Sequence, residues 1–453
     1  MSCCCPQAVP VSICSLATPT EATSLLPRSK IGSLRRHQDR KTMSTSDVAA
    51  SPARPTIASP QPRAIVSSPM ADYYMLILAV AVLVTLGELM VLSSSAALAQ
   101  AAGKSPYHYS IQQLLHLGIG VIAAVLLSRF PADWLRRLGW VAWGLALVLL
   151  MLIFTPMGYS YQGNRNWLRI AGFTFQPSEF AKLALIVWSA AVLHLKRKQL
   201  HDPARLVWPF VPGAALILAL ILAERDVGTG LVVGFVILAL LFFVGVPYRV
   251  LVPATLFASV VVGFLIRFSD SRMSRIQVFL DPQSNPDLAS QPLAALYAMA
   301  TGGWWGTGLG AGRQKWGGLK DGVHTDFIFA VIGEELGLFG VVLLVIMFAL
   351  IARAGLSIAL KSDRMFNRLA AAGIVAWFLA QAIVNMAVVM HLVPVLGVPL
   401  PFVSSGGSAL VASLMAVGVL LSLARDTPAA RRYLRAQKRK AGPRLTSVMA
   451  DRS

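Results

Sequence analysis

Ten long apolar runs dominate the chain between residues 73 and 424. Each is close to the ~20 helical residues that cross the roughly 30 Å hydrocarbon core of a bilayer. The runs lie at 73–93, 111–128, 138–155, 178–195, 207–223, 228–246, 248–267, 326–352, 368–391 and 404–424. They lack the period-two alternation of a membrane barrel, so we expect an all-α polytopic membrane protein with ten transmembrane helices.

Two of the connecting segments, 156–177 and 268–325, are much longer than the others. Long loops in a compact bundle commonly carry a functional site, so function is sought there first. Apolar residues recur at helical spacing in the second loop, at Leu293, Leu296, Tyr297 and Ala300. This spacing predicts a helix that lies on the membrane surface or dips into it.

The composition agrees with a membrane protein and excludes a soluble basic one. Apolar residues make up 56% of the chain and charged residues 13%, and 40 Lys and Arg against 20 Asp and Glu give a net charge of +20. The mean hydropathy is +0.65. Nucleic-acid-binding proteins carry their positive charge on a charge-rich surface, so no nucleic-acid partner is expected.

Lys and Arg gather in the two tails and in alternate loops, which places both termini in the cytoplasm. The large loop between the seventh and eighth helices is then extracytoplasmic. Residues 1–71 are rich in Ser, Pro, Ala and Arg and are expected to form a disordered basic cytoplasmic tail without a cleavable signal peptide. The four cysteines in this tail are not spaced as metal ligands, and no metal site is predicted. Residues 72–424 form the transmembrane domain, and 425–453 form a basic cytoplasmic tail.

A glycine-rich stretch, 302–312, lies in the large outer loop beside Trp304 and Trp305. Backbone amides of such a stretch can approach a phosphate. The stretch follows no strand, however, and a flexible turn at the membrane interface explains it equally well. Arg313 and Lys315 follow directly, and because basic residues are disfavoured on the outer face, they are candidates for binding an anion.

Ionisable residues within the spans or at their ends are costly unless they are paired or hydrated. Glu179 and Lys182 stand three residues apart in the fourth run and can share one helix face. A structural ion pair and a functional role are equally open for them. Asp226 precedes the sixth run, where its carboxylate either caps a helix N-terminus or serves a site.

Asp326 lies at the outer mouth of the eighth run, directly after His324 and Thr325. Helix capping is one role for this carboxylate. The other is that of a general base, because a carboxylate beside apolar helix ends can have a raised pKa. Glu334 and Glu335 lie roughly 12 to 14 Å farther along the helix. They are expected to hold neighbouring helices together.

Four segments, in order along the chain, carry a family resemblance. They are NRNWLRIAGFTFQPSEFAKLA (164–184), ERDVGTG (224–230), GRQKWGGLKDGVHTDFIFAVIGEELG (312–337) and VPLPFVSSGGS (398–408). Together they resemble the SEDS family of shape, elongation, division and sporulation proteins, over about residues 73–424. GRQKW and GEELG are most similar to the FtsW branch, the division enzymes. Arg225 departs from the Pro usual in the family, and Asn166 precedes Trp167 where the family often has Arg.

This resemblance implies a peptidoglycan glycosyltransferase that polymerises lipid II on the outer face of the bacterial plasma membrane, during septal cell wall synthesis in cell division. The essential Asp of the family falls on Asp326, and further polar positions fall on Glu179, Lys182 and Asp226. Asp326 would take the proton from the 4-hydroxyl of the acceptor GlcNAc as that oxygen attacks C1 of the donor MurNAc. Undecaprenyl pyrophosphate would leave with inversion at C1.

The anionic leaving group calls for cationic and polar groups around it. The candidate substrate-binding residues are Glu179, Lys182, Asp226, Arg165, Arg313, Lys315, His324 and Thr325, and a divalent cation such as Mg²⁺ or Mn²⁺ could assist them. The resemblance also implies a class B penicillin-binding protein of the FtsI transpeptidase type as partner, together with other division proteins, and enrichment at the septum. The basic tails are expected to bind membrane lipids.

Two other functions fit part of the pattern. A flippase that carries lipid II across the bilayer would also keep ionisable groups among its helices, although the strongest motif here lies at an outer loop rather than at the midplane. A non-catalytic scaffold for division proteins would not need an acidic residue at position 326.

Overall fold

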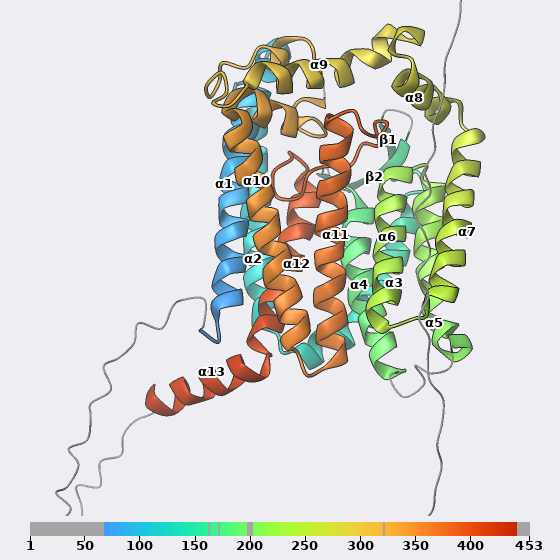
Figure 1. The fold of residues 1–453 in the computed structure, drawn as a ribbon, viewed down its shortest axis with the longest axis vertical. Helices are drawn as coiled ribbons and strands as arrows, with labels where there is room; N and C mark the ends of the chain where they lie inside the picture. Colours follow the sequence, from blue (N-terminus) through green and yellow to red (C-terminus); the bar gives the residue numbers. More distant parts are fainter. Residues whose placement is uncertain (1–67, 162–163, 171–172, 197–202, 320–321, 442–453) are drawn as a thin grey trace, which may run out of the picture. The chain divides into compact units, whose positions relative to one another are not determined.

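The computed structural model describes residues 68–161, 164–170, 173–196, 203–319 and 322–441. Its α-helices are α1 (Ala71–Ala101), α2 (His108–Arg129), α3 (Ala132–Leu152), α4 (Pro177–Leu195), α5 (Pro203–Ala223), α6 (Val227–Val244), α7 (Tyr248–Arg267), α8 (Asp270–Leu280), α9 (Pro286–Gly302), α10 (Ile328–Lys361), α11 (Met365–Val389), α12 (Gly407–Arg425) and α13 (Pro428–Ala441) (Figure 1). Ten of them, α1 to α7 and α10 to α12, coincide with the predicted runs. The polytopic helical membrane fold is confirmed.

Nine of the described helices are long and apolar enough to cross a membrane. The fifth predicted run differs from the others, because α5 has non-helical dihedral angles at Trp208 and continues as a shorter apolar helix, Trp208–Ala223. Almost all of the predicted N-terminal tail lies outside the described residues. In the predicted C-terminal tail, residues 428–441 form α13.

The first outer loop forms a small antiparallel sheet that the apolar pattern did not predict. Strands β1 (Gly158–Tyr161), β2 (Asn164–Ile170) and β3 (Phe173–Phe175) lie in the order β1-β2-β3. Tyr159 pairs with Trp167, and Arg169 pairs with Thr174. The sheet brings Asn164 and Asn166 to the end of the bundle at which α4 and α6 begin.

Helices α4 and α12 form the centre of the bundle, since 89% of the apolar window of each is buried, against 6% for α7. Small residues allow this close packing in a membrane protein, where apolar burial alone does not drive helices together. A Cβ atom on Gly418 of α12 would lie 2.5 Å from the carbonyl oxygen of Ala124 in α2. Helices α2 and α12 therefore approach each other backbone to backbone.

The glycine-rich stretch packs against a break in α10. Gly337 interrupts that helix with φ 63° and ψ −156°. Its backbone lies so close to the stretch that a Cβ atom on Gly337 would be 2.3 Å from the Gly306 amide nitrogen. The amides of Thr307 and Gly308 donate to the carbonyls of Glu334 and Glu335. Both of these amides are thus engaged by α10, and the role of the glycines is close backbone approach.

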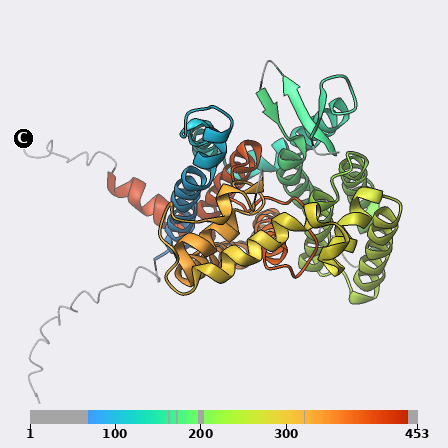
Figure 2. The ribbon, with the colours of Figure 1, turned by 90° about the horizontal axis from the view of Figure 1, so that it is seen from above.

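Helices α8 and α9 form the large loop and lie across one end of the bundle (Figures 1 and 2). A helix is confirmed at the predicted residues: α9 contacts α10, buries Ala294, Ala295 and Ala298 and leaves Tyr297 exposed. The start of α1 and α13 lie at the opposite end of the bundle. We call the end that carries α8, α9 and the sheet the outer end, following the charge bias of the loops.

Candidate active site

A cavity of about 830 Å³ lies at the outer end, beneath α8 and α9. Its walls come from β2, α8, α9, the turn before α10 and the segment between α11 and α12. The polar residues that line it are Tyr109, Asn164, Asn166, Gln176, Asp226, Ser274, Arg275, Asp287, Gln291, His324, Thr325, Asp326, His391, Ser405 and Ser408. Pockets of this size are typical of sites for small organic ligands.

Asp326 lies in this cavity, in a turn whose backbone is fixed by three hydrogen bonds. The amide of Ser405 donates to the His324 carbonyl (2.8 Å), and the Ser404 hydroxyl donates to the Thr325 carbonyl (2.6 Å). Asn385 Nδ2 of α11 donates to the Asp326 carbonyl, also at 2.8 Å. Three successive carbonyls are therefore bound by α11 and by the segment before α12, which fixes the carboxylate in place.

The Asp326 carboxylate does not cap α10. Phe327 is the N-cap residue, and no side chain accepts a hydrogen bond at that helix end. Among the residues that the structure describes, none donates a hydrogen bond to this carboxylate. The capping alternative is therefore wrong, and the carboxylate is open to a ligand in the cavity.

Burial raises the pKa of Asp326 to about 6, with Arg275 opposing and Asp226 reinforcing the shift. A carboxyl group with this pKa is largely ionised at neutral pH, yet it binds a proton more strongly than an exposed Asp does. Both properties suit a general base, which works best when its pKa lies near the working pH.

For the reaction that the family resemblance implies, glycan synthesis from lipid II, this pKa predicts a pH-dependent rate. Below about pH 6 the protonated Asp326 cannot accept a proton, so kcat/KM should rise about fivefold from pH 5 to pH 6 and level off above pH 7. Initial rates of lipid II consumption at subsaturating substrate, over pH 5 to 8, measure the profile. A flat profile over that range would contradict ionisation of Asp326 as a requirement.

Asp226 is held by a full set of donors. Its carboxylate accepts from Asn166 Nδ2 (3.1 Å), Gln176 Nε2 (3.0 Å), the Thr229 amide (3.0 Å) and the Thr229 hydroxyl (2.9 Å). The bond to the Thr229 amide makes Asp226 the N-cap of α6, so the capping role is confirmed. It also lines the cavity, where it adds negative charge beside Asp326.

Burial and the neighbouring Asp226 raise the pKa of Glu224 to about 9, so Glu224 is neutral at pH 7.

Glu179 and Lys182 form the ion pair that their spacing predicts, with 2.8 Å between Lys182 Nζ and Glu179 Oε1. Both side chains are buried, and neither lines the cavity. Lys182 also donates to Gln381 Oε1, and Gln381 donates to the Pro399 carbonyl (2.8 Å). The ion pair therefore supports the segment before α12 through Gln381, from the side away from the cavity.

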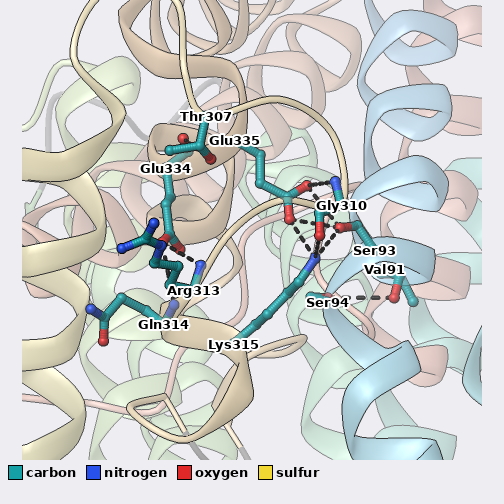
Figure 3. A network of polar contacts seen from close by, with 10 residues as sticks. All are labelled: Val91, Ser93, Ser94, Thr307, Gly310, Arg313, Gln314, Lys315, Glu334 and Glu335. Atoms are coloured by element: carbon teal, nitrogen blue, oxygen red, sulfur yellow. Dashed lines mark hydrogen bonds and ion pairs between the residues drawn. The ribbon is translucent and has the colours of Figure 1, made fainter.

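Lys315 does not face the cavity. Its Nζ donates to Glu335 Oε1 (2.7 Å), the Gly310 carbonyl (2.7 Å) and Ser93 Oγ (3.0 Å) (Figure 3). Ser93 in turn donates to Glu335 from α1. This network joins α1, α10 and the large loop, as expected for a glutamate that holds neighbouring elements. It also engages all three ammonium hydrogens of Lys315, which leaves none for an anion.

The other two predicted cations also lie away from the cavity walls. Arg313 is exposed, and its backbone amide donates to Glu334 Oε1 (2.7 Å) (Figure 3). Arg165 donates from Nη2 to the Thr155 carbonyl (2.7 Å) within the first outer loop. The alternation of β2 places the neighbouring Asn166, rather than Arg165, against Asp226. Of the predicted residues, the structure brings together Asp226, His324, Thr325 and Asp326.

Several residues of the cavity and its support were not predicted from the sequence. Arg275 of α8 is a cation in the cavity wall. It lies in the outer loop, where the spacing of residues in the sequence does not indicate that its side chain reaches a cavity. His391, held with φ 54° and packed on Phe279, also lines the cavity. Asn385 was detectable in principle, because an amide within an apolar run needs a partner just as an ionisable group does.

Asn385 is predicted to be a positioning residue. Its Nδ2 donates to the carbonyls of Asp326 and Val398, at 2.8 Å each. Replacing it with Leu leaves both carbonyls without this donor, at a cost of about 1 to 3 kcal/mol for each. We expect Asn385→Leu to lower both the unfolding temperature and kcat, and Ile383→Leu, at an exposed position of α11, to change neither. Unchanged unfolding and turnover in Asn385→Leu would contradict the role.

Comparison with known proteins identifies the family of the chain. The profile of the family described as "Cell cycle protein" (FtsW, RodA and SpoVE) matches residues 73–428. A Mycobacterium tuberculosis protein named probable peptidoglycan glycosyltransferase FtsW is 36% identical over 388 residues, which is 85% of this chain and 74% of that protein. A protein of the same name from Trichlorobacter lovleyi is 35% identical over 357 residues, covering 78% of this chain and 93% of its own.

Two solved structures share the fold. A chain of a peptidoglycan synthase complex, described as coordinating polymerization and crosslinking, superposes with a TM-score of 0.65 at 27% identity, over 78% of this chain and 98% of that one. The rod shape determining protein RodA of Thermus thermophilus superposes with a TM-score of 0.57 at 29% identity, over 78% and 96%. The chain therefore belongs to the FtsW, RodA and SpoVE family of cell cycle proteins, the SEDS family.

Proposed function

We propose that Asp326 is the general base with which this chain polymerises lipid II into glycan strands at its outer end. The chain is a peptidoglycan glycosyltransferase, the class for which its relatives are named. The observation that carries the role of Asp326 is its carboxylate, which is open to the large cavity while three hydrogen bonds fix the backbone around it. A fixed carboxylate that accepts no hydrogen bond from the described residues is suited to accept a proton from a substrate.

The reaction divides into a proton transfer and a displacement. Asp326 accepts the proton of the acceptor GlcNAc 4-hydroxyl while its oxygen forms a bond to C1 of the donor MurNAc. The bond from C1 to the pyrophosphate oxygen breaks, and its electron pair leaves with undecaprenyl pyrophosphate. Attack opposite the leaving group inverts the configuration at C1. Asp326 is near pKa 6, so it then releases the proton readily at neutral pH.

The cavity suits a divalent cation that is held partly by the substrate. The described residues contain no group of three or more His, Cys, Asp or Glu side chains that could hold a metal by themselves. Mg²⁺ is often bound by one or two carboxylates together with substrate phosphates. The Asp226 oxygens are engaged in hydrogen bonds and Asp326 is assigned to the proton transfer, so Asp287 is the carboxylate of the cavity that would hold such a cation together with the substrate phosphates.

We infer the partner of the chain and its location in the cell from the same family. The chain is a multi-pass membrane protein, and one of its structural neighbours is part of a synthase complex. We assign it an FtsI-type class B penicillin-binding protein as partner, together with other division proteins, at the septum, with both termini in the cytoplasm. The charge bias of the loops and the similarity to FtsW proteins support this assignment.

Reconstitution separates polymerisation from lipid II transport. The full chain and its class B partner are placed in liposomes that contain fluorescent lipid II, and products are separated by gel electrophoresis before and after digestion with a muramidase. We expect long strands that the muramidase cuts. Transfer of lipid II between leaflets without any strands would contradict the polymerase and favour the flippase.

A further inference from the structure

A second, smaller cavity of about 190 Å³ adjoins the large one at the outer end. The two share lining residues, among them Asn164, Asp226 and Arg275. The small cavity differs from the large one in its charge, because Arg225 and Arg272 also line it. None of these three arginines was a candidate for anion binding in the sequence analysis.

The local backbone gathers the three arginines. Arg225 has φ 65°, a left-handed conformation uncommon outside glycine. In the turn that this creates, Glu224 and Asp226 are buried while Arg225 remains exposed. Arg272 and Arg275 are three residues apart on α8, so they share one face of that helix.

Backbone carbonyls orient the guanidinium groups on α8. Arg272 donates to the carbonyls of Leu265 (2.9 Å) and Arg225 (3.2 Å). Arg275 donates to the Val395 carbonyl (3.3 Å). An arginine has five N–H donors, so these bonds leave several donors on each for a ligand.

The positive charge of this cluster is not neutralised within the described part of the chain. None of the salt bridges there includes Arg225, Arg272 or Arg275. Burial lowers the pKa of Arg272, and the positive charges of Arg225 and Arg275 lower it further. The neighbouring Asp226 opposes this shift, but its carboxylate is engaged by other donors. Three adjacent cations of this kind are suited to an anion with several oxygens.

Part of the lining of the small cavity is apolar. Leu231 of α6, Ile266 of α7 and Ile276 of α8 line it. Helix α7 is the least buried of the candidate spans, with 6% of its apolar window buried, so it presents most of its surface to lipid. The cavity therefore joins a cationic wall to a lipid-facing helix.

We propose that Arg225, Arg272 and Arg275 bind the diphosphate of a polyprenyl-linked substrate, with its chain leaving the cavity beside α7. This rests on the proposed function, because it assigns the leaving group of that reaction to a place beside Asp326. As the bond from C1 to oxygen breaks, negative charge grows on the diphosphate, and the guanidinium groups stabilise it. The cluster takes the role that Arg313, Lys315 and Arg165 were expected to fill.

Binding of farnesyl diphosphate to the purified full chain tests this assignment without requiring turnover. Calorimetric titration in detergent compares farnesyl diphosphate, inorganic pyrophosphate and farnesol. We expect wild type to bind farnesyl diphosphate most tightly, and Arg272→Gln and Arg275→Gln each to weaken it about 10- to 100-fold, the loss of a charge-assisted hydrogen bond. Arg225→Gln should also weaken it and should fold, since the side chain is exposed and the carbonyl that binds Arg272 is retained.

Two controls separate this site from the proposed catalysis. Arg267→Gln removes an exposed outer cation that does not line the small cavity, and it should bind farnesyl diphosphate as wild type does. Asp326→Asn should bind it at least as tightly. Wild-type affinity in Arg225→Gln and in both α8 variants would overturn the assignment while leaving the role of Asp326 intact. Equal affinity of wild type for inorganic pyrophosphate and farnesyl diphosphate would overturn the lipid-linked ligand.

Discussion

Replacing Asp326 with Asn should reduce the rate of glycan synthesis by about 100- to 10,000-fold, the usual contribution of a general base. Asn has nearly the same shape but cannot accept the proton of an attacking hydroxyl. The Asp326 backbone carbonyl keeps its bond to Asn385, so the turn itself should be unchanged. The measurement is the initial rate of strand formation from lipid II in the presence of the class B partner.

The same substitution should not destabilise the protein. Burial raises the pKa of Asp326 from 3.8 to about 6, so the folded chain binds this proton more tightly than the unfolded chain does. The free energy of unfolding therefore falls as the pH rises from about 3.8 to about 6. An Asn at this position does not ionise, so the variant does not lose this stability. At pH 7 we expect Asp326→Asn to unfold at the wild-type temperature or above it. Asp270→Asn, at an exposed carboxylate of α8, should keep wild-type synthesis. A large fall in the unfolding temperature of Asp326→Asn would show that Asp326 has a structural role instead.

Replacing Lys315 with Met should lower the free energy of unfolding by about 3 to 5 kcal/mol, as expected when one partner of a buried ion pair is removed. The side chains of Lys315 and Glu335 are only 3% and 0% exposed, and 2.7 Å separates Nζ from Oε1 (Figure 3). Among the described residues, the variant leaves the buried Glu335 carboxylate with only the Ser93 hydroxyl and the Gly310 amide as donors. Thermal unfolding in detergent measures the loss.

A double variant and a surface pair complete this test. Lys315→Met with Glu335→Met removes both charges and should recover most of the stability that Lys315→Met loses. Lys361→Met breaks the ion pair between Lys361 and Asp72. Because the Lys361 side chain is 57% exposed, this substitution should lower the free energy of unfolding by no more than about 1 kcal/mol. If Lys315→Met cost no more than Lys361→Met, the network would not hold the large loop to α1 and α10.

The helices could be predicted because apolar runs of membrane-spanning length are a strong local signal. The runs located α1 to α7 and α10 to α12, and the spacing around Leu296 located α9. The sheet in the first outer loop was missed, because its strands are short and their pairing depends on contacts beyond local pattern. The break at Gly337 was missed for a related reason, since it becomes visible only when the glycine-rich stretch packs against it.

The carboxylates of the candidate site could be predicted better than its cations. Asp226 and Asp326 lie beside apolar runs, where a charged side chain is costly unless it is paired or hydrated. Both line the cavity. Lys315 and Arg275 both lie in the outer loop, and sequence alone does not reveal which one has a buried carboxylate beside it. Lys315 pairs with Glu335 from α10, twenty residues farther along, while Arg275 reaches the cavity. That distinction is made by tertiary packing.

The most direct test of the central claim measures lipid II binding and strand formation in the same samples of wild-type and Asp326→Asn protein, each with its class B partner. We predict equal binding of lipid II by both, muramidase-sensitive strands from wild type, and none above background from the variant. Strand formation by Asp326→Asn at the wild-type rate would contradict the assignment of Asp326 as the base.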